Sequence, residues 1–139
     1  MNTETDTRVT ADMAEAISDA ARACHQLARE KGWWPELVEL PTMANDQRVN
    51  TIGAKIALIH SEASEALEAL RECGSLADIR EVKHSGPRLK PEGFGVELAD
   101  VIIRCFDLAC AVGVDVGALI RDKHSFNAGR EHRHGGKNL

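Results

Sequence analysis

The sequence predicts an all-α protein, a bundle of four to five helices in a single domain that covers residues 1–139. Apolar residues recur at spacings of three and four, the period of a helix with one buried face, and the alternation typical of strands is nearly absent. Alanine and leucine supply much of the apolar content, whereas aromatic residues are only 4% and tyrosine is absent. This composition favours closely packed helices over sheets.

The first two helices are each marked at their ends. Thr10 is expected to cap a helix that Gly32 terminates, and residues 1–9 before it are expected to be flexible. Residues 33–50 contain two prolines and are expected to be irregular. The second helix is expected from about residue 50 to residue 73, with a glycine after it.

The second half of the chain predicts a loop and two more helices. Residues 81–95 are rich in proline, glycine and lysine and are expected to form a loop. The third helix, residues 95–112, is apolar almost all round, which predicts burial on most sides, and Gly113 ends it. Asp115 suits the N-cap of a fourth helix over residues 116–128, and a glycine-rich tail from about 131–139 is expected to be flexible.

Composition excludes several functional classes. The net charge of −5 argues against nucleic-acid binding, which requires a basic face. No apolar run reaches the roughly 18 residues of a membrane span, so we expect a cytoplasmic protein without membrane contact. The four cysteines form no Cys-x-x-Cys pair, which favours buried free thiols in a reducing compartment; they are Cys24, Cys73, Cys105 and Cys110.

Two pairs of acids interrupt the apolar faces of the second and third helices. Glu62 and Glu65 lie three residues apart, as do Glu97 and Asp100, so each pair projects from one helix face. If the faces meet, four carboxylates converge, and their mutual repulsion would be relieved by protonation or by a bound cation. Oxygen ligands of this kind suit Mg²⁺ or Mn²⁺ rather than zinc.

Two alternative readings of these acids remain open. In the first, the acids are solvated and Asp100 pairs with Arg104 one turn further along the helix. In the second, they belong to a di-iron bundle, which requires Glu-x-x-His on two helices. Residues 81–84 and 131–134 match that spacing, but they fall in the loop and in the tail, and we interpret both matches as coincidence.

A basic stripe follows near the end of the chain. Lys123, Asn127 and Arg130 would share one face if the fourth helix extends that far. Arginine can bind two phosphate oxygens at once, so the three side chains could form a phosphate clamp beside a carboxylate-bound metal. The alternative is a solvated helix end, where cations are favoured by the helix dipole.

Three segments in this order resemble the MazG-like family of all-α nucleoside triphosphate pyrophosphatases, in particular its small single-domain members. The resemblance covers about residues 50–137. The segments "LIHSEASEALEALR" and "VELADVIIRCFDLA" match the family's ExxE…ExxD signature, and "KHSFNAGREHRHGGK" is similar to its lysine, asparagine and arginine segment. The segment between the two acid pairs is longer than is typical of the family.

The resemblance implies an activity, a site and an assembly. Such enzymes hydrolyse a nucleoside triphosphate between the α and β phosphates, giving the monophosphate and pyrophosphate. On matching positions, Glu62, Glu65, Glu97 and Asp100 would be catalytic and would bind Mg²⁺, and the substrate would be held by Lys123, Asn127 and Arg130. The family fold is the four-to-five-helix bundle shared with dimeric dUTPases, assembled as a homodimer or homotetramer.

The sequence also offers residues that could recognise the base. A purine nucleotide such as dGTP or GTP is our expectation. Trp33 and Trp34 could stack on a base but are more typical of core or interface aromatics, and the polar residues 45–50 could read base edges. The alternatives are a dUTPase or a phosphoribosyl-ATP pyrophosphohydrolase of the same superfamily, and a non-catalytic helical dimerisation module.

Overall fold

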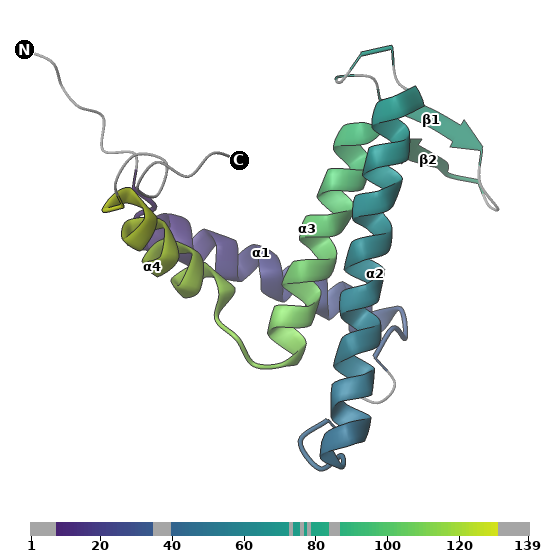
Figure 1. The fold of residues 1–139 in the computed structure, drawn as a ribbon. Coiled ribbons are helices and arrows are strands. Elements are labelled where there is room, and N and C mark those ends of the chain that lie inside the picture. The colour runs from purple at the N-terminus through teal and green to yellow at the C-terminus, as the bar shows by residue number, and fades with distance from the viewer. Residues whose placement is uncertain are drawn as a thin grey trace, which may run out of the picture.

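Four helices and one short β-hairpin make up the part of the chain that the computed structural model describes, residues 8–34, 40–72, 74–75, 77, 79–83 and 87–130 (Figure 1). In chain order these elements are α1 (Ala11–Glu30), α2 (Asn45–Glu72), β1 (Arg80–Lys83), β2 (Leu89–Glu92), α3 (Phe94–Ala111) and α4 (Val116–Ala128). The prediction of a mainly helical protein is confirmed. The predictions for the two chain ends fall largely outside the described residues.

The helices form two pairs that meet at a steep angle. In Figure 1, α2 and α3 lie side by side and antiparallel, and the β-hairpin sits at the end where α2 finishes and α3 begins. Helix α1 crosses α3 near the opposite end, and α4 lies along α1, away from the hairpin. The acid pairs and the basic stripe therefore belong to different helix pairs.

Helix α1 begins and ends where the sequence predicts. The Thr10 side chain accepts a hydrogen bond from the backbone N–H of Met13 at 3.2 Å. At the other end Gly32 takes a φ of 79°, and the N–H of Trp33 donates to the carbonyl of Ala28 at 3.0 Å. This is a Schellman arrangement, in which glycine supplies the left-handed residue. It fixes the direction in which the chain leaves α1.

Helix α4 is likewise capped as predicted and packs closely on α1. The Asp115 carboxylate accepts from the N–H of Ala118 at 3.1 Å and from the Ser18 hydroxyl of α1 at 2.7 Å. A Cβ at Gly117 would lie 2.0 Å from the backbone oxygen of Ala14, so the two helix backbones approach as only glycine permits.

Helix α2 begins earlier than predicted, at Asn45 rather than near residue 50. The backbone N–H of Arg48 donates to the carbonyl of Ala44 at 2.9 Å, and the Arg48 guanidinium donates to the Asn45 side chain at 3.1 Å. Asp46 adds a negative charge in the first turn, which the helix dipole favours. The polar run that we interpreted as irregular therefore forms a solvated first turn.

The predicted loop over residues 81–95 is wrong for much of its length, because β1 and β2 pair in an antiparallel hairpin. Arg80 lies opposite Glu92, which places unlike charges across the ladder. Pro91 is tolerated because each strand of a two-stranded sheet is an edge. Strands of four residues are too short and too polar to give a clear alternation in sequence.

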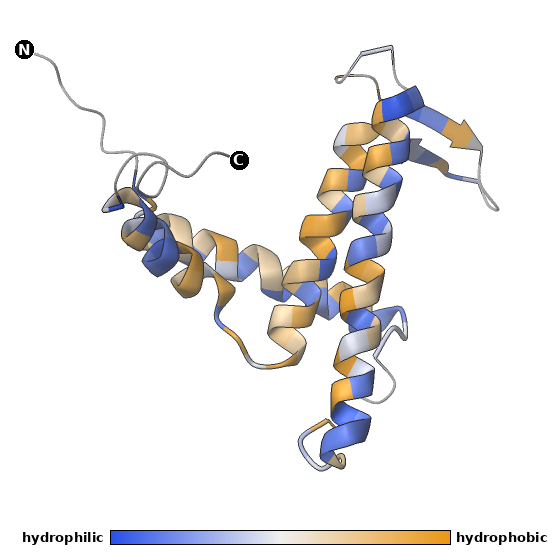
Figure 2. Cartoon of the chain, viewed as in Figure 1, coloured by the Kyte–Doolittle hydropathy of each residue, from blue (hydrophilic) through white to orange (hydrophobic). Residues whose placement is uncertain are grey.

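The buried core of one chain is small. The buried apolar residues among those described are Ala14, Ala21, Trp34, Leu40 and Ala66. Large apolar side chains remain exposed on α2 and α3, and Figure 2 shows α3 as the most hydrophobic helix. The prediction that this helix is buried on most sides is therefore wrong for the single chain, since Leu98, Ile102 and Ile103 are exposed.

No helix in the described residues combines the length and the apolar character needed to cross a membrane. The cytoplasmic location stays a prediction. The described cysteines, Cys24, Cys105 and Cys110, are free thiols, as predicted, but Cys105 is exposed and the other two are only half-buried. Partial burial raises the pKa of all three thiols, which makes them weak nucleophiles. Cys73 lies outside the described residues.

Candidate functional site

Three of the four predicted metal ligands come together between α2 and α3. Carboxylate oxygens of Glu62, Glu65 and Glu97 lie within 4.8 Å of one another. Glu62 and Glu97 are only 6% and 7% exposed, whereas Glu65 faces solvent. The group forms because the i, i+3 pair of α2 meets the first turn of α3 across the interface of the antiparallel helices.

Burial and neighbouring charge disfavour the ionisation of Glu97. The pKa of Glu97 is raised, first by burial and then by the carboxylates of Glu65 and Asp100. Lys90 on β2 opposes the shift without cancelling it. A bound cation would attract the Glu97 carboxylate and offset both causes, so this arrangement favours a positive charge beside the glutamates.

The fourth predicted ligand, Asp100, lies beside the group rather than in it. Its pKa is raised by burial and by Glu62, and lowered by Arg104 and Lys90. It also lines an apolar pocket between α1, α2 and α3. Asp100 therefore stands between the three glutamates and that pocket.

Arg104 is a site residue whose partner the sequence did not indicate. Its Nε donates to Glu62 Oε1 at 2.5 Å, and a second guanidinium nitrogen contacts the same oxygen. The alternative reading paired Arg104 with Asp100 on its own helix, whereas the structure joins it to α2. This ion pair offsets the cost of burying Glu62 and neutralises part of the acidic group.

The donor set fits a hard divalent cation. All three donors are carboxylate oxygens, which Mg²⁺ and Mn²⁺ prefer. Two ligands on opposite sides of one Mg²⁺ lie about 4.2 Å apart, twice its bond length. The three carboxylate oxygens lie within 4.8 Å of one another, which is close to that span, and the exposed Glu65 side chain can rotate to fit an ion.

A second polar network lies further along α3, around Asp107, three residues beyond Arg104, and the sequence analysis missed it. The Asp107 carboxylate accepts from the indole N–H of Trp34 at 2.7 Å and contacts His25 Nδ1 at 2.7 Å. The Lys55 ammonium lies 4.1 Å from the centre of a Trp34 ring. Asp107 belongs to the same polar stripe of α3 as Glu97 and Asp100, and that was the available signal.

The two tryptophans have different environments. Trp34 is 6% exposed and its indole N–H is bound, so it is a core residue, as the second interpretation predicted. Trp33 is 59% exposed and lines the apolar pocket, which has a volume of about 340 Å³. The polar residues of the first turn of α2 are absent from the described lining of this pocket.

The basic stripe is not beside the carboxylates within one chain. Lys123 and Asn127 lie on α4 and Arg130 follows it, all three exposed. The Lys123 ammonium and the Arg130 guanidinium flank Phe126, at 5.0 and 5.7 Å from the ring centre. In Figure 1, α4 lies along α1, far from the end of α3 that carries Glu97.

The di-iron alternative gains no support from the described residues. Glu81 lies on β1 rather than inside a helix. His84, Glu131 and His134 fall outside the described residues.

Comparisons with protein-family models, with curated proteins and with solved structures gave no match to this chain. The resemblance to the MazG-like family therefore stays a prediction carried by the three sequence segments.

Proposed function

We propose that this protein is a Mg²⁺-dependent nucleoside triphosphate pyrophosphohydrolase. It would cleave a nucleoside or deoxynucleoside triphosphate, with dGTP or GTP preferred, between the α and β phosphates. The observation that carries the proposal is the group formed by Glu62, Glu65 and Glu97, two of them buried, with their oxygens within 4.8 Å. A divalent cation would relieve the repulsion among two buried carboxylates and a third that lies this close to them.

The residues have separable roles in this proposal. Glu62, Glu65 and Glu97 would hold Mg²⁺ or Mn²⁺, with Asp100 available at the edge of the group. The bound ion would supply neutralisation of phosphate charge and a more acidic attacking water. Arg104 holds the Glu62 carboxylate in place, and the exposed Glu65 is the carboxylate that solvent protons reach most easily.

The phosphate clamp in this proposal comes from a second copy of the chain. Lys123, Asn127 and Arg130 carry the right chemistry for triphosphate oxygens, but their helix lies far from the carboxylates of its own chain. A homodimer or homotetramer would bring α4 of one copy toward α2 and α3 of another. The exposed apolar side chains of α2, α3 and α4 support such an assembly, because monomers rarely leave so much apolar surface uncovered.

Product analysis tests the proposal directly. The purified protein is incubated with Mg²⁺ and each of the eight standard ribo- and deoxynucleoside triphosphates, and the products are identified by ³¹P NMR. The expected result is monophosphate and pyrophosphate, with no turnover in EDTA. A diphosphate with orthophosphate, or full activity in EDTA, would show that the proposal is wrong.

A second candidate function is a non-catalytic helical dimerisation module. The ion pair between Glu62 and Arg104 favours it, because a neutralised glutamate needs no metal. Calorimetric titration with Mg²⁺ separates the two functions, since this module would show no binding. Within the enzyme class, turnover restricted to dUTP would indicate a dUTPase, and turnover restricted to phosphoribosyl-ATP would indicate the corresponding pyrophosphohydrolase.

A further inference from the structure

An apolar pocket of about 340 Å³ opens between α1, α2 and α3. Its size falls at the small end of the range for small-molecule sites. Most of its wall is aliphatic or aromatic, and its apolar lining comprises Cys24, Leu27, Ala28, Trp33, Leu58, Ile103 and Leu108. A wall of this kind suits a flat, mainly apolar ligand group of modest size.

The pocket lies next to the carboxylate group and shares two neighbouring residues with it. Asp100 and Arg104 both line it. Asp100 raises the pKa of Glu97 by its charge, and Arg104 donates to Glu62, so both residues also face the glutamates. A ligand that binds a cation at the glutamates would therefore extend into the pocket past these two side chains.

Trp33 offers the pocket an unoccupied aromatic face. Its position is fixed by two backbone contacts, since its N–H donates to the carbonyl of Ala28 and its carbonyl accepts from Lys55 Nζ at 2.7 Å. Its side chain is 59% exposed. Trp34, by contrast, is covered by Lys55 and bound by Asp107, so only the first of the two tryptophans can receive a ligand.

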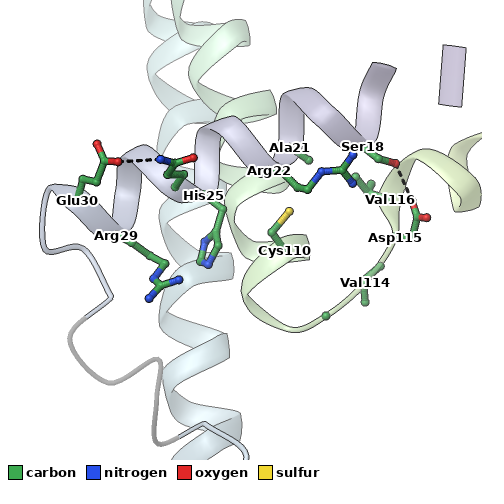
Figure 3. A pocket seen from close by; sticks show the side chains of 12 residues that line it. Ser18, Ala21, Arg22, His25, Arg29, Glu30, Cys110, Val114, Asp115 and Val116 are labelled. Carbon is green, nitrogen blue, oxygen red and sulfur yellow. Dashed lines mark hydrogen bonds between the residues drawn. The ribbon is translucent and has the colours of Figure 1, made fainter. Parts of the chain in front are cut away.

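A larger cavity, of about 830 Å³, lies between α1 and the segment joining α3 to α4 (Figure 3). It is remote from the glutamates, and most of its polar groups already have partners within the protein. Arg22 pairs with Asp19, Gln26 donates to Glu30, and Ser18 donates to Asp115. No excess charge or convergent set of free donors identifies a ligand for it.

We infer that the smaller pocket binds the base of a nucleoside triphosphate, with Trp33 stacking on the base. The inference rests on the proposed function, because the triphosphate would be held at the neighbouring glutamates. Its described lining includes no side-chain amide to read a base edge, and Asp107 already accepts from Trp34 and His25. Selection between bases would then come from size and stacking strength, which favours purines over pyrimidines.

The first test uses fluorescence and requires no turnover. Acrylamide, a neutral quencher, should reach Trp33 far more readily than Trp34, because one is 59% and the other 6% exposed. With dGMP and Mg²⁺ as the probe, we expect quenching of the wild-type protein to fall. In Trp33→Phe the dGMP-dependent change should disappear, because the remaining tryptophan is already covered.

The second test separates base binding from phosphate binding. Removing one base–aromatic stack should raise the KM for dGTP about fivefold to a hundredfold in Trp33→Ala. The inhibition constant of inorganic tripolyphosphate, which has no base, should stay within about twofold of wild type, since that anion makes no stacking contact. Trp33→Phe should restore most of the lost affinity for dGTP, because it keeps an aromatic face.

A matched pair of variants tests the pocket volume. Ala28→Phe places a ring in the pocket wall and should raise the KM for dGTP, whereas Ala23→Phe, on an exposed position of the same helix, should not. Pyrophosphate release without any shielding of Trp33 would overturn this inference and leave the proposed function standing. Equal KM values for Ala28→Phe and Ala23→Phe would do the same. Shielding by dGMP without turnover of any triphosphate would support the pocket and show that the proposed function is wrong.

Discussion

Two of the predicted metal ligands on α2 and α3 are buried, whereas Lys123 and Arg130 lie on the surface. Glu62 and Glu97 are almost fully buried, and Arg104 reaches across to bind one of them. Lys123 and Arg130 contact only the exposed ring of Phe126 among the interactions described for them. The two charged regions therefore differ in how strongly the fold constrains them.

That difference determines how much each region says about function. Burying an acid beside other acids is costly, so the arrangement needs a cation, a proton or an ion pair to persist. A solvated lysine or arginine costs almost nothing, and its position alone implies little. The carboxylate group is thus the stronger evidence for a site, and the basic stripe becomes evidence only if another copy brings it to that group.

The largest expected effect comes from the acidic region. Glu65→Gln should lower kcat/KM by about a hundredfold or more, equivalent to about 2.7 kcal/mol, because it removes one charged oxygen donor from the group. Stability without metal should stay within about 0.5 kcal/mol or rise slightly, since Glu65 is exposed and repels Glu97. Steady-state kinetics and melting curves in EDTA measure the two effects.

The matched control for this variant is Glu68→Gln, on the same helix. Glu68 is exposed and, among the described residues, pairs with Arg71 in the next turn, at 2.5 Å. Its replacement should leave kcat/KM within about twofold, because exposed pairs of this kind contribute little. Equal losses in the two variants would point to a general effect of charge on α2. Unfolding of Glu65→Gln would point to a structural role for that residue.

The basic region should give the next largest effect. Lys123→Ala and Arg130→Ala should each lose about 1.5–3 kcal/mol of transition-state binding, or roughly tenfold to a hundredfold in kcat/KM. Arg130→Lys should also be impaired, because lysine keeps the charge but not the planar fork. Arg121→Ala, on the same helix, is the control, since Arg121 pairs with its neighbour Asp122 at 2.9 Å.

Mixing two impaired variants tests whether the regions meet between copies. If α4 of one chain serves the glutamates of another, each mixed dimer of Glu65→Gln and Arg130→Ala contains one intact site. Random reassortment then restores about a quarter of the wild-type rate. If both regions acted within one chain, mixing would restore nothing, and the separation seen between α4 and the carboxylates would have to close by a conformational change.

The sequence predicted those features that depend on neighbours along the chain. The helix ends could be predicted, because each depends on a single turn of backbone. They are the N-caps Thr10 and Asp115 and the terminating glycines Gly32 and Gly113. The acid pairs were readable for the same reason, since residues three apart share a helix face. The hairpin was missed because its strands are short and contain a proline.

Contacts between helices were predicted less well. Three of the four predicted ligands meet, but the pairing of Arg104 with Glu62 and of Trp34 with Asp107 was missed. Each of these pairs joins distant segments, and its formation depends on how far each helix is rotated about its own axis. Helical periodicity identifies a face but does not say which residue of the partner helix it will meet.

Two glycine substitutions test how closely the helices pack within each pair. Gly117→Ala should destabilise the protein by about 1–3 kcal/mol, because its new Cβ would collide with the backbone oxygen of Ala14 in α1. Gly53→Ala, in α2, should instead stabilise by about 0.5–1 kcal/mol, since nothing lies within 4 Å and alanine favours the helix. Chemical denaturation measures both. Destabilisation by Gly53→Ala would indicate that another copy packs against that position.

The smallest expected effect is a pH dependence confined to the acidic region. The pKa of Glu97 is raised by burial, by Glu65 and by Asp100, so the folded chain holds a proton that the unfolded chain releases. The free energy of unfolding in EDTA should therefore fall as pH rises above 4.5, the ordinary value of a glutamate, through the raised pKa. The fall should be modest, because Lys90 offsets part of the repulsion.

Saturating Mg²⁺, or the variant Glu97→Gln, should remove this pH dependence. Melting curves between pH 4.5 and about pH 8 measure the slope. A slope that stays unchanged in both conditions would mean that other groups cause it, and that Glu97 neither holds the extra proton nor binds the metal.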